Sequence, residues 1–122
     1  MESKPRTSVL PDMPQPASIT DRRIRHVLEQ IDAEPQHSVP SLARAHSLSA
    51  SHLEHLFKRH TGRRLREHII HARVCRAEHL LKTTELSIKE IALCVGYAHS
   101  PSFIRVFTSI RDESPRAYRH RA

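Results

Sequence analysis

An internal repeat, in which equivalent residues recur 49 or 50 positions apart, most constrains the fold of this chain. Four pairs have the first offset and two have the second: Ser38, Val39, Leu42 and Ala43 with Ser87, Ile88, Ile91 and Ala92, and Leu53 and Phe57 with Phe103 and Phe107. The apolar residues of each copy are spaced so that they share one face of a helix. Six matches at a nearly constant offset predict that one helical unit occurs twice.

The first copy is predicted to form two short helices joined by a turn. Ser38 is a residue type that caps helices, and we place the first helix over residues 39–45. Ser49 is expected to cap a second helix over residues 50–60, which Gly62 ends by supplying a left-handed residue. Two short helices around a tight turn make a helix-turn-helix.

The second copy follows the same plan. Ser87 and Glu90 have the spacing of a capping box for its first helix, which is predicted over residues 88–95. We expect Ser100 to cap its second helix, which ends near residue 110.

Residues 65–82 separate the two copies and are predicted to form one long helix. They contain no Gly or Pro, and apolar residues recur at helical spacing between Leu65 and Leu81. At a rise of 1.5 Å per residue this segment has a length of roughly 27 Å. The segment is therefore expected to be a rod that carries one copy at each end.

Additional segments are expected at both ends of the chain. Thr20 is placed to cap a helix that precedes the first copy, with Ile19 packed across its start. A last short helix is expected after Ser114. Residues 1–18 carry four prolines and few large apolar residues, so they are expected to be a disordered tail or linker.

The predicted fold class is all-α, with about seven helices in two helix-turn-helix lobes. The first lobe covers residues 19–64, the linker helix residues 65–82, and the second lobe residues 83–122. The chain has only two Gly and three Phe and lacks Trp, which argues against a β architecture rich in turns.

The formal net charge is +7 at pH 7, which favours a phosphate-bearing partner over a membrane surface or an acidic protein. No apolar run reaches membrane-spanning length. Cys75 and Cys94 lie inside helical patterns without CxxC spacing, so two buried, reduced thiols are expected. The histidines include pairs such as His52 and His55, but no Cys or carboxylate partners have matching spacing. No metal site and no cofactor are therefore expected.

Two stretches resemble the DNA-binding domain of the AraC/XylS family of bacterial transcription regulators. They are SVPSLARAHSLSASHLEHLFKRHTG in the first copy and, with higher specificity, LSIKEIALCVGYAHSPSFIRVF followed by SPRAYR in the second. The resemblance covers residues 19–121 and implies two helix-turn-helix lobes joined by a long helix. The chain departs from the family pattern at Ser47, where a turn glycine is usual, and at His68, where an aromatic residue is common. It is similar to the short, stand-alone members, because no sensor domain is recognisable.

The second helix of a helix-turn-helix enters the major groove of DNA. The helical faces and the resemblance together predict base contacts from Ser51, Glu54, His55, Ser100, Ser102 and Arg105. Arg105 can bond both acceptors of a guanine, or instead contact a phosphate. Glu54 can accept from a cytosine amino group, or instead pair with Lys58 four residues later.

Basic residues beside the recognition helices are expected to contact the phosphate backbone. The predicted phosphate contacts are Lys58, Arg59, Arg63, Arg64 and Arg116, with Arg119 as a weaker candidate.

The predicted function is that of a sequence-specific transcription regulator that binds double-stranded DNA. One chain can place both recognition helices in successive major grooves, which predicts a monomer on an asymmetric site. The resemblance implies an activator that touches RNA polymerase and is cytoplasmic, associated with the nucleoid. Enzymatic activity is not expected, because the sequence shows no glycine-rich phosphate loop, carboxylate pair or Cys/His nucleophile site.

Two other interpretations stay open. His46, Ser47 and His55 depart from the family pattern, which suits an interaction or antagonist protein that keeps the fold without specific reading of DNA. The chain also suits the detached output domain of a larger ligand-sensing regulator, in which residues 1–18 are the remnant of a tether.

Overall fold

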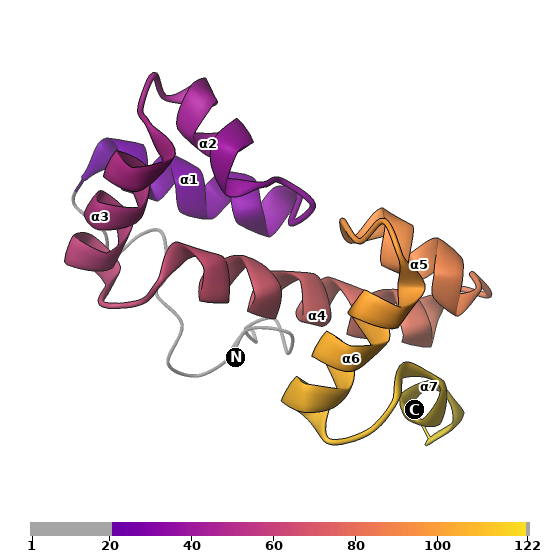
Figure 1. Cartoon of the computed structure of the whole chain (residues 1–122). Coiled ribbons are helices and arrows are strands. Elements are labelled where there is room, and N and C mark those ends of the chain that lie inside the picture. Colours follow the sequence, from indigo (N-terminus) through magenta and orange to yellow (C-terminus); the bar gives the residue numbers. More distant parts are fainter. Residues whose placement is uncertain (1–20, 122) are drawn as a thin grey trace, which may run out of the picture.

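The computed structural model describes residues 21–121, which form seven helices and no strand (Figure 1). The helices are α1 (Arg22–Ala33), α2 (Val39–Ala45), α3 (Ala50–Thr61), α4 (Leu65–Thr83), α5 (Ile88–Cys94), α6 (Ser100–Arg111) and α7 (Pro115–Arg121). The predicted all-α fold is confirmed. Within these residues, no helix is both long enough and apolar enough to cross a membrane.

The long helix α4 runs through the molecule, with α1–α3 at its N-terminal half and α5–α7 at its C-terminal half (Figure 1). Each group of helices buries its own apolar core. Helix α4 contributes three residues to each core, which are Leu65, Ile69 and Ala72 in the first lobe and Val74, Ala77 and Leu81 in the second. The apolar residues of α4 therefore face two directions instead of forming one stripe.

The repeat extends into α4 itself, beyond the positions that the sequence pattern revealed. Three buried residues of α1 correspond, at an offset of 50, to three buried residues of α4: Ile24, Val27 and Ile31 to Val74, Ala77 and Leu81. The second half of α4 therefore serves as the first helix of the second lobe.

In the same way, α7 takes the place that the first half of α4 has in the first lobe. His68 of α4 is 1% exposed and its ring centroid lies 5.6 Å from that of Phe57. At an offset of 50, Tyr118 of α7 is 7% exposed and lies 5.7 Å from Phe107. A histidine thus fills, in the first core, the position that a tyrosine fills in the second.

The turns of the two helix-turn-helix units have matching backbones. Ser47 and Gly96 both have a positive φ, of 57° and 108°, and Gly62 and Asp112 end α3 and α6 with φ of 78° and 60°. The predicted left-handed end at Gly62 is confirmed. The backbone bonds that close the two turns are Leu48 N–H to Ala43 C=O (2.9 Å) and Tyr97 N–H to Ala92 C=O (2.8 Å).

Three predicted helix caps are confirmed. The Ser38 and Ser49 hydroxyls each accept a bond from the backbone N–H three residues later, at 3.2 and 3.1 Å. Ser87 accepts from the Glu90 N–H at 3.0 Å, while the Glu90 carboxylate accepts from the Ser87 N–H at 2.8 Å. The observed ends of α3, α4, α5 and α6 differ from the predicted ends by one residue each.

Two other predicted caps are wrong. Asp21, not Thr20, caps α1, because its carboxylate accepts bonds from the N–H groups of residues 23 and 24 at 2.9 and 3.2 Å. Thr20 lies outside the described residues, as does the predicted packing of Ile19. His99, not Ser100, is the N-cap of α6, because its carbonyl already accepts the first helical bonds and Ser100 is helical.

Candidate nucleic-acid interface

Helix α3, the predicted recognition helix of the first lobe, buries one face and exposes the other. Leu53, Leu56 and Phe57 pack into the first core, spaced at three and four residues as an amphipathic helix requires. The predicted base-contacting residues of this helix are all exposed, namely Ser51, Glu54 and His55. The structure therefore leaves them accessible to a partner.

Helix α6 repeats this arrangement with fewer charges. Its two phenylalanines are fully buried, and Arg105 is exposed. Ser100 and Ser102 are half-buried at the start of the helix. Arg105 corresponds, at an offset of 50, to His55 of α3, so the strongest hydrogen-bond donor among these candidates lies in the second lobe.

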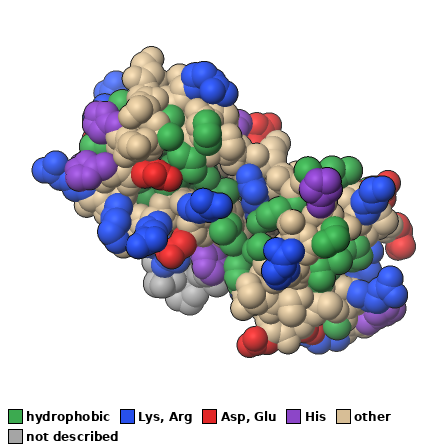
Figure 2. Space-filling view, viewed as in Figure 1, with side chains coloured by type: hydrophobic (Ala, Val, Ile, Leu, Met, Phe, Trp, Pro, Cys, Tyr) green, Lys and Arg blue, Asp and Glu red, His purple; other side chains and the backbone are tan. Residues whose placement is uncertain are grey.

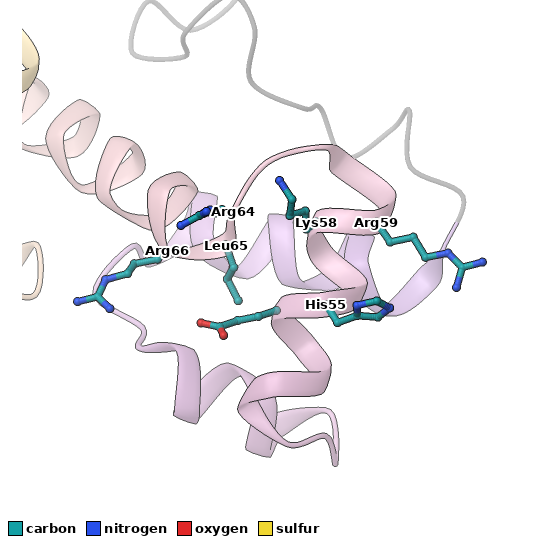
Figure 3. A pocket seen from close by; sticks show the side chains of 7 residues that line it. His55, Lys58, Arg59, Arg64, Leu65 and Arg66 are labelled. Atoms are coloured by element: carbon teal, nitrogen blue, oxygen red, sulfur yellow. The ribbon is translucent and has the colours of Figure 1, made fainter.

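A groove of about 600 Å³ lies where the end of α3 meets the start of α4 (Figure 3). It is lined by Glu54, His55, Lys58, Arg59, Arg64, Leu65 and Arg66. In Figure 3, His55, Lys58 and Arg59 project from α3, and Arg64, Leu65 and Arg66 belong to the adjoining turn and the start of α4. The structure thus brings five predicted site residues into one groove.

Arg66 is a groove residue that the sequence-based assignment missed. The run Arg63-Arg64-Leu65-Arg66 contained the signal. When an apolar residue at the start of a helix faces the core, the residues beside it face outward. The structure buries Leu65 in this way, at 1% exposure. The groove holds four permanent cations and one carboxylate, that of Glu54. Figure 2 shows Lys and Arg side chains over α3 and the start of α4.

The start of α4 adds partial positive charge to this groove. Its N-cap, Arg64, makes no side-chain bond to the first turn, so the side chain of Arg64 leaves those N–H groups to other partners. The N-terminus of a 19-residue helix favours anions. The arrangement suits a phosphate group better than a neutral ligand.

The remaining predicted phosphate contacts differ in exposure. Arg116 is exposed on α7, whereas Arg63 is half-buried between α3 and α4. Arg119 is also half-buried, and its guanidinium donates to the carbonyls of Leu81 (3.1 Å), Thr84 (3.1 Å) and Leu86 (2.7 Å). Arg119 therefore links α7 to the end of α4, and these bonds explain the conformation of the Arg119 side chain without a contact to DNA.

The two cysteines lie in different environments. Cys75 is buried, and burial raises the pKa of its thiol to about 11. The Nη2 of Arg111 lies 3.8 Å from its sulfur and donates to Oε1 of Glu78 at 3.2 Å, and the Nε of Arg111 pairs with the other oxygen of that carboxylate at 2.5 Å. Cys94 is exposed, so the expectation of two buried thiols is wrong for this residue, which lies outside the buried face that Ile91 and Ala92 form on α5.

Two histidines of the first lobe have lowered pKa values. Burial, with smaller effects of Arg63 and His71, lowers the pKa of His68 to about 4. Burial also lowers the pKa of His46, whose ring lies 2.7 Å from the amide oxygen of Gln30. Among residues 21–121, no three His, Cys, Asp or Glu side chains lie close enough together to hold a metal ion.

Comparison with known proteins places this arrangement in a family. Residues 42–121 match a family described as a helix-turn-helix domain. The chain is 33% identical over 100 residues to the regulatory protein SoxS of Salmonella typhimurium, a match that covers 80% of this chain and 94% of SoxS. Other curated relatives are longer, and the chain spans between 28% and 44% of the length of four of them.

Solved structures share the fold. One is an AraC-type transcriptional regulator from Chromobacterium violaceum, with a TM-score of 0.68 and 26% identity over 80% of this chain and 89% of that chain. Another is the DNA-binding domain of the global transcriptional factor AdpA in complex with a target DNA, with a TM-score of 0.67 and 26% identity over 88% of this chain and 92% of that chain. On these matches, the chain belongs to the AraC/XylS family of helix-turn-helix transcription regulators.

Proposed function

We propose that this protein is a sequence-specific, DNA-binding transcription regulator that places α3 and α6 in successive major grooves. The observation that carries the proposal is the structural repeat, in which each lobe exposes the polar face of its second helix. A helix of this kind fits the major groove. The family relatives and the solved complex of AdpA with DNA support the same function.

Base discrimination is assigned chiefly to Arg105. An exposed arginine on a recognition helix can donate two bonds to O6 and N7 of one guanine, worth roughly 1–3 kcal/mol of discrimination. Ser100 and Ser102 contribute shorter contacts from the same helix. In the first lobe, Ser51, Glu54 and His55 are assigned to bases, with Glu54 accepting from a cytosine amino group.

Phosphate binding is assigned to the groove between α3 and α4, through Lys58, Arg59 and Arg64, with Arg63 beside it. Arg116 is assigned the same role beside α6. If about six phosphates are engaged, the logarithm of the binding constant falls against the logarithm of salt with a slope of roughly −5.

The length of α4 sets the geometry of the complex. Its 19 residues span roughly 28 Å, whereas one turn of DNA is about 34 Å. One chain therefore suits an asymmetric site bound by a monomer. The DNA must bend to make up the difference between the two lengths, at a cost of a few kcal/mol. In this proposal the two reading lobes cover residues 19–64 and 83–122, and residues 65–82 both separate the recognition helices and complete the core of each lobe.

Two further parts of the proposal rest on the relatives. Curated relatives include the transcriptional activator RhaR of Mannheimia succiniciproducens and the lactose operon transcription activator of Staphylococcus xylosus. We infer that this chain is also a non-enzymatic activator, which acts in the cytoplasm and touches RNA polymerase.

Selection of bound DNA from a random pool at near-physiological salt tests the proposal. The expected result is two boxes with a fixed spacing and no palindrome. Arg105→Ala should relax the preference at one position of one box, whereas Arg116→Ala should weaken binding to all sequences alike. A pool without any shared motif would favour an interaction or antagonist protein, and inverted half-sites bound by a dimer would exclude the monomer.

A further inference from the structure

The two lobes touch each other directly, at a joint that lies against the middle of α4. The joint is formed by the loop between α1 and α2 in the first lobe and by the turn between α5 and α6 in the second. Arg73 of α4 lies between them and contacts both. The turn between α5 and α6 leads directly into the recognition helix α6, so a change in the position of this turn relative to the first lobe also moves α6 relative to that lobe.

On the side of the first lobe, Arg73 binds three successive carbonyl groups. Its Nε donates to the carbonyl of Pro35 at 2.8 Å, and its Nη2 donates to those of Gln36 and His37 at 3.3 and 3.2 Å. These residues follow α1 directly, and α1 has no basic residue in its own last turn. Arg73 therefore places a positive charge just beyond the C-terminal end of that helix, where a cation is favoured, and Arg76 binds the last carbonyl of the helix, that of Ala33.

On the side of the second lobe, Arg73 contacts the turn through an aromatic ring and a glycine. Its guanidinium carbon lies 5.0 Å from the centroid of the Tyr97 ring, within the range of a cation–π interaction. A Cβ on Gly96 would lie 3.0 Å from that guanidinium carbon and 2.9 Å from the Cα of Gln36. The backbones of the two lobes therefore meet so closely that only glycine fits between them.

We propose that Arg73 is a positioning residue that fixes the orientation of one lobe against the other, and thereby the spacing of the two DNA boxes that the chain accepts. The inference rests on the proposed function, because it assigns a role in choosing among DNA sites. Without Arg73, the lobes are still joined by α4, by the bond from Arg76 to Ala33 and by the close approach at Gly96. Arg73 lies on neither recognition helix, so its loss is expected to change the orientation of α6 relative to α3 and to leave the base preferences within each box unchanged.

The first test measures binding to DNA in which the two selected boxes are separated by the preferred spacing or by one base pair more or less. Each base pair changes both the distance and the rotation between the boxes. For Arg73→Ala, the preference for the native spacing should fall by about tenfold, while the base preferences within each box stay as in the wild-type protein. Undiminished preference for the native spacing in a folded Arg73→Ala protein would overturn the inference.

Arg76→Ala is the matched control on the same helix. The Arg76 guanidinium donates to the carbonyl of Ala33 at 2.9 Å and so also joins α4 to the first lobe, but no contact between it and the turn that leads into α6 is found among the described residues. This variant should keep the spacing preference. An equal loss in both variants would show that any weakened contact between α4 and α1 has the same effect, and would also overturn the role of Arg73.

A pair of glycine variants tests the joint from the other side. Gly96→Ala and Gly62→Ala both place a side chain at positive φ, of 108° and 78°. Only Gly96→Ala meets the other lobe, because a Cβ on Gly62 has nothing within 4 Å. Gly96→Ala should change the preferred spacing and Gly62→Ala should not. The same spacing profile in both variants would argue against a close-fitting joint.

A measurement without DNA separates this inference from the proposed function. Spin labels on the exposed Cys94 and on an introduced cysteine at the exposed position Arg44 report the distance between α5 and α2. Cys75 is buried with a raised pKa, so it reacts little near neutral pH. The distance distribution should be narrow in the wild type and clearly broader in Arg73→Ala. Equal widths would refute the joint, whether or not the protein reads DNA.

Discussion

His68 is expected to make the first lobe sensitive to acid. Its side chain is 1% exposed against Phe57, and neither ring nitrogen has a hydrogen-bond partner among the described residues. Burial is the main cause that lowers its pKa to about 4, and the neighbouring Arg63 and His71 act in the same direction. The second lobe has Tyr118 at the equivalent position, and a tyrosine carries no charge at acidic pH.

The sign and size of the effect follow from the two pKa values of His68. In the unfolded chain the imidazole titrates near 6.5, whereas in the folded protein it titrates near 4. Stability is therefore highest above about pH 6.5, because neither state then binds the proton. As the pH falls, the unfolded state takes up the proton first and stability is lost. The loss reaches about 1.4 kcal/mol at pH 5.5 and about 3 kcal/mol at pH 4, and it levels off at about 3.4 kcal/mol at lower pH.

Urea unfolding between pH 7.5 and 5 measures this loss when the wild-type protein is compared with His68→Phe. Phe keeps the ring against Phe57 and removes the titrating group. The free energy of unfolding of the variant should fall less as the pH is lowered, and the loss at pH 5.5 should be about 1.4 kcal/mol smaller than in the wild type. His79→Phe, at an exposed position of the same helix, controls for loss of a histidine as such. Equal pH slopes for the wild type and His68→Phe would refute the reasoning.

Two further predictions concern stability. Ser47 has a φ of 57°, which costs a non-glycine residue roughly 1 kcal/mol. Ser47→Gly should therefore raise the free energy of unfolding by about 0.5 kcal/mol, once the added freedom of the unfolded chain is subtracted, and so raise the urea midpoint. A lower midpoint would show that Ser47 makes a compensating contact. Arg119→Ala should destabilise the protein by about 2 kcal/mol, because three carbonyls lose a charged donor. Arg116→Ala, on the same helix but exposed, should leave the free energy of unfolding within about 0.5 kcal/mol of the wild-type value. Equal effects of the two substitutions would contradict the assigned role of Arg119.

The helices could be predicted because their signals are local. Ser38, Ser49 and Ser87 each bond an N–H three residues away, and Gly62 ends its helix through its own backbone angle. Such features depend only on neighbouring residues. Where two adjacent residues can both act as a cap, as Thr20 and Asp21 can, the pattern does not choose between them, and the structure has Asp21.

The contacts that hold the lobes together could not be predicted in the same way. Arg73 and Arg119 bind backbone carbonyls 33 to 38 residues away. Every residue offers a carbonyl, so the acceptors leave no mark on the sequence. From the sequence alone, Arg73 is one of several basic residues in the predicted long helix and has no assigned role, and Arg119 is a weaker candidate for phosphate contact.

The same distinction changes what the net charge means for DNA binding. Several arginines are held by the protein itself, among them Arg73, Arg76 and Arg119. The formal charge of +7 is thus not spread evenly over the two reading faces. Four exposed cations, Lys58, Arg59, Arg64 and Arg66, gather in the groove of the first lobe.

The second lobe lacks that concentration of charge at the equivalent positions. At an offset of 50, the four cations of the groove correspond to Thr108, Ser109, Ser114 and Arg116, so three of the four charges are lost. At the same offset, His55 is replaced by Arg105, which gains the donor geometry that guanine recognition requires. Phosphate contacts supply affinity without sequence information, whereas base contacts supply discrimination. We infer that the two lobes contribute unequally to these tasks. The first lobe supplies more of the phosphate contacts and hence more of the salt dependence, and the second lobe supplies the stronger base contact, that of Arg105. The proposed joint at Arg73 then holds the two contributions in a single register.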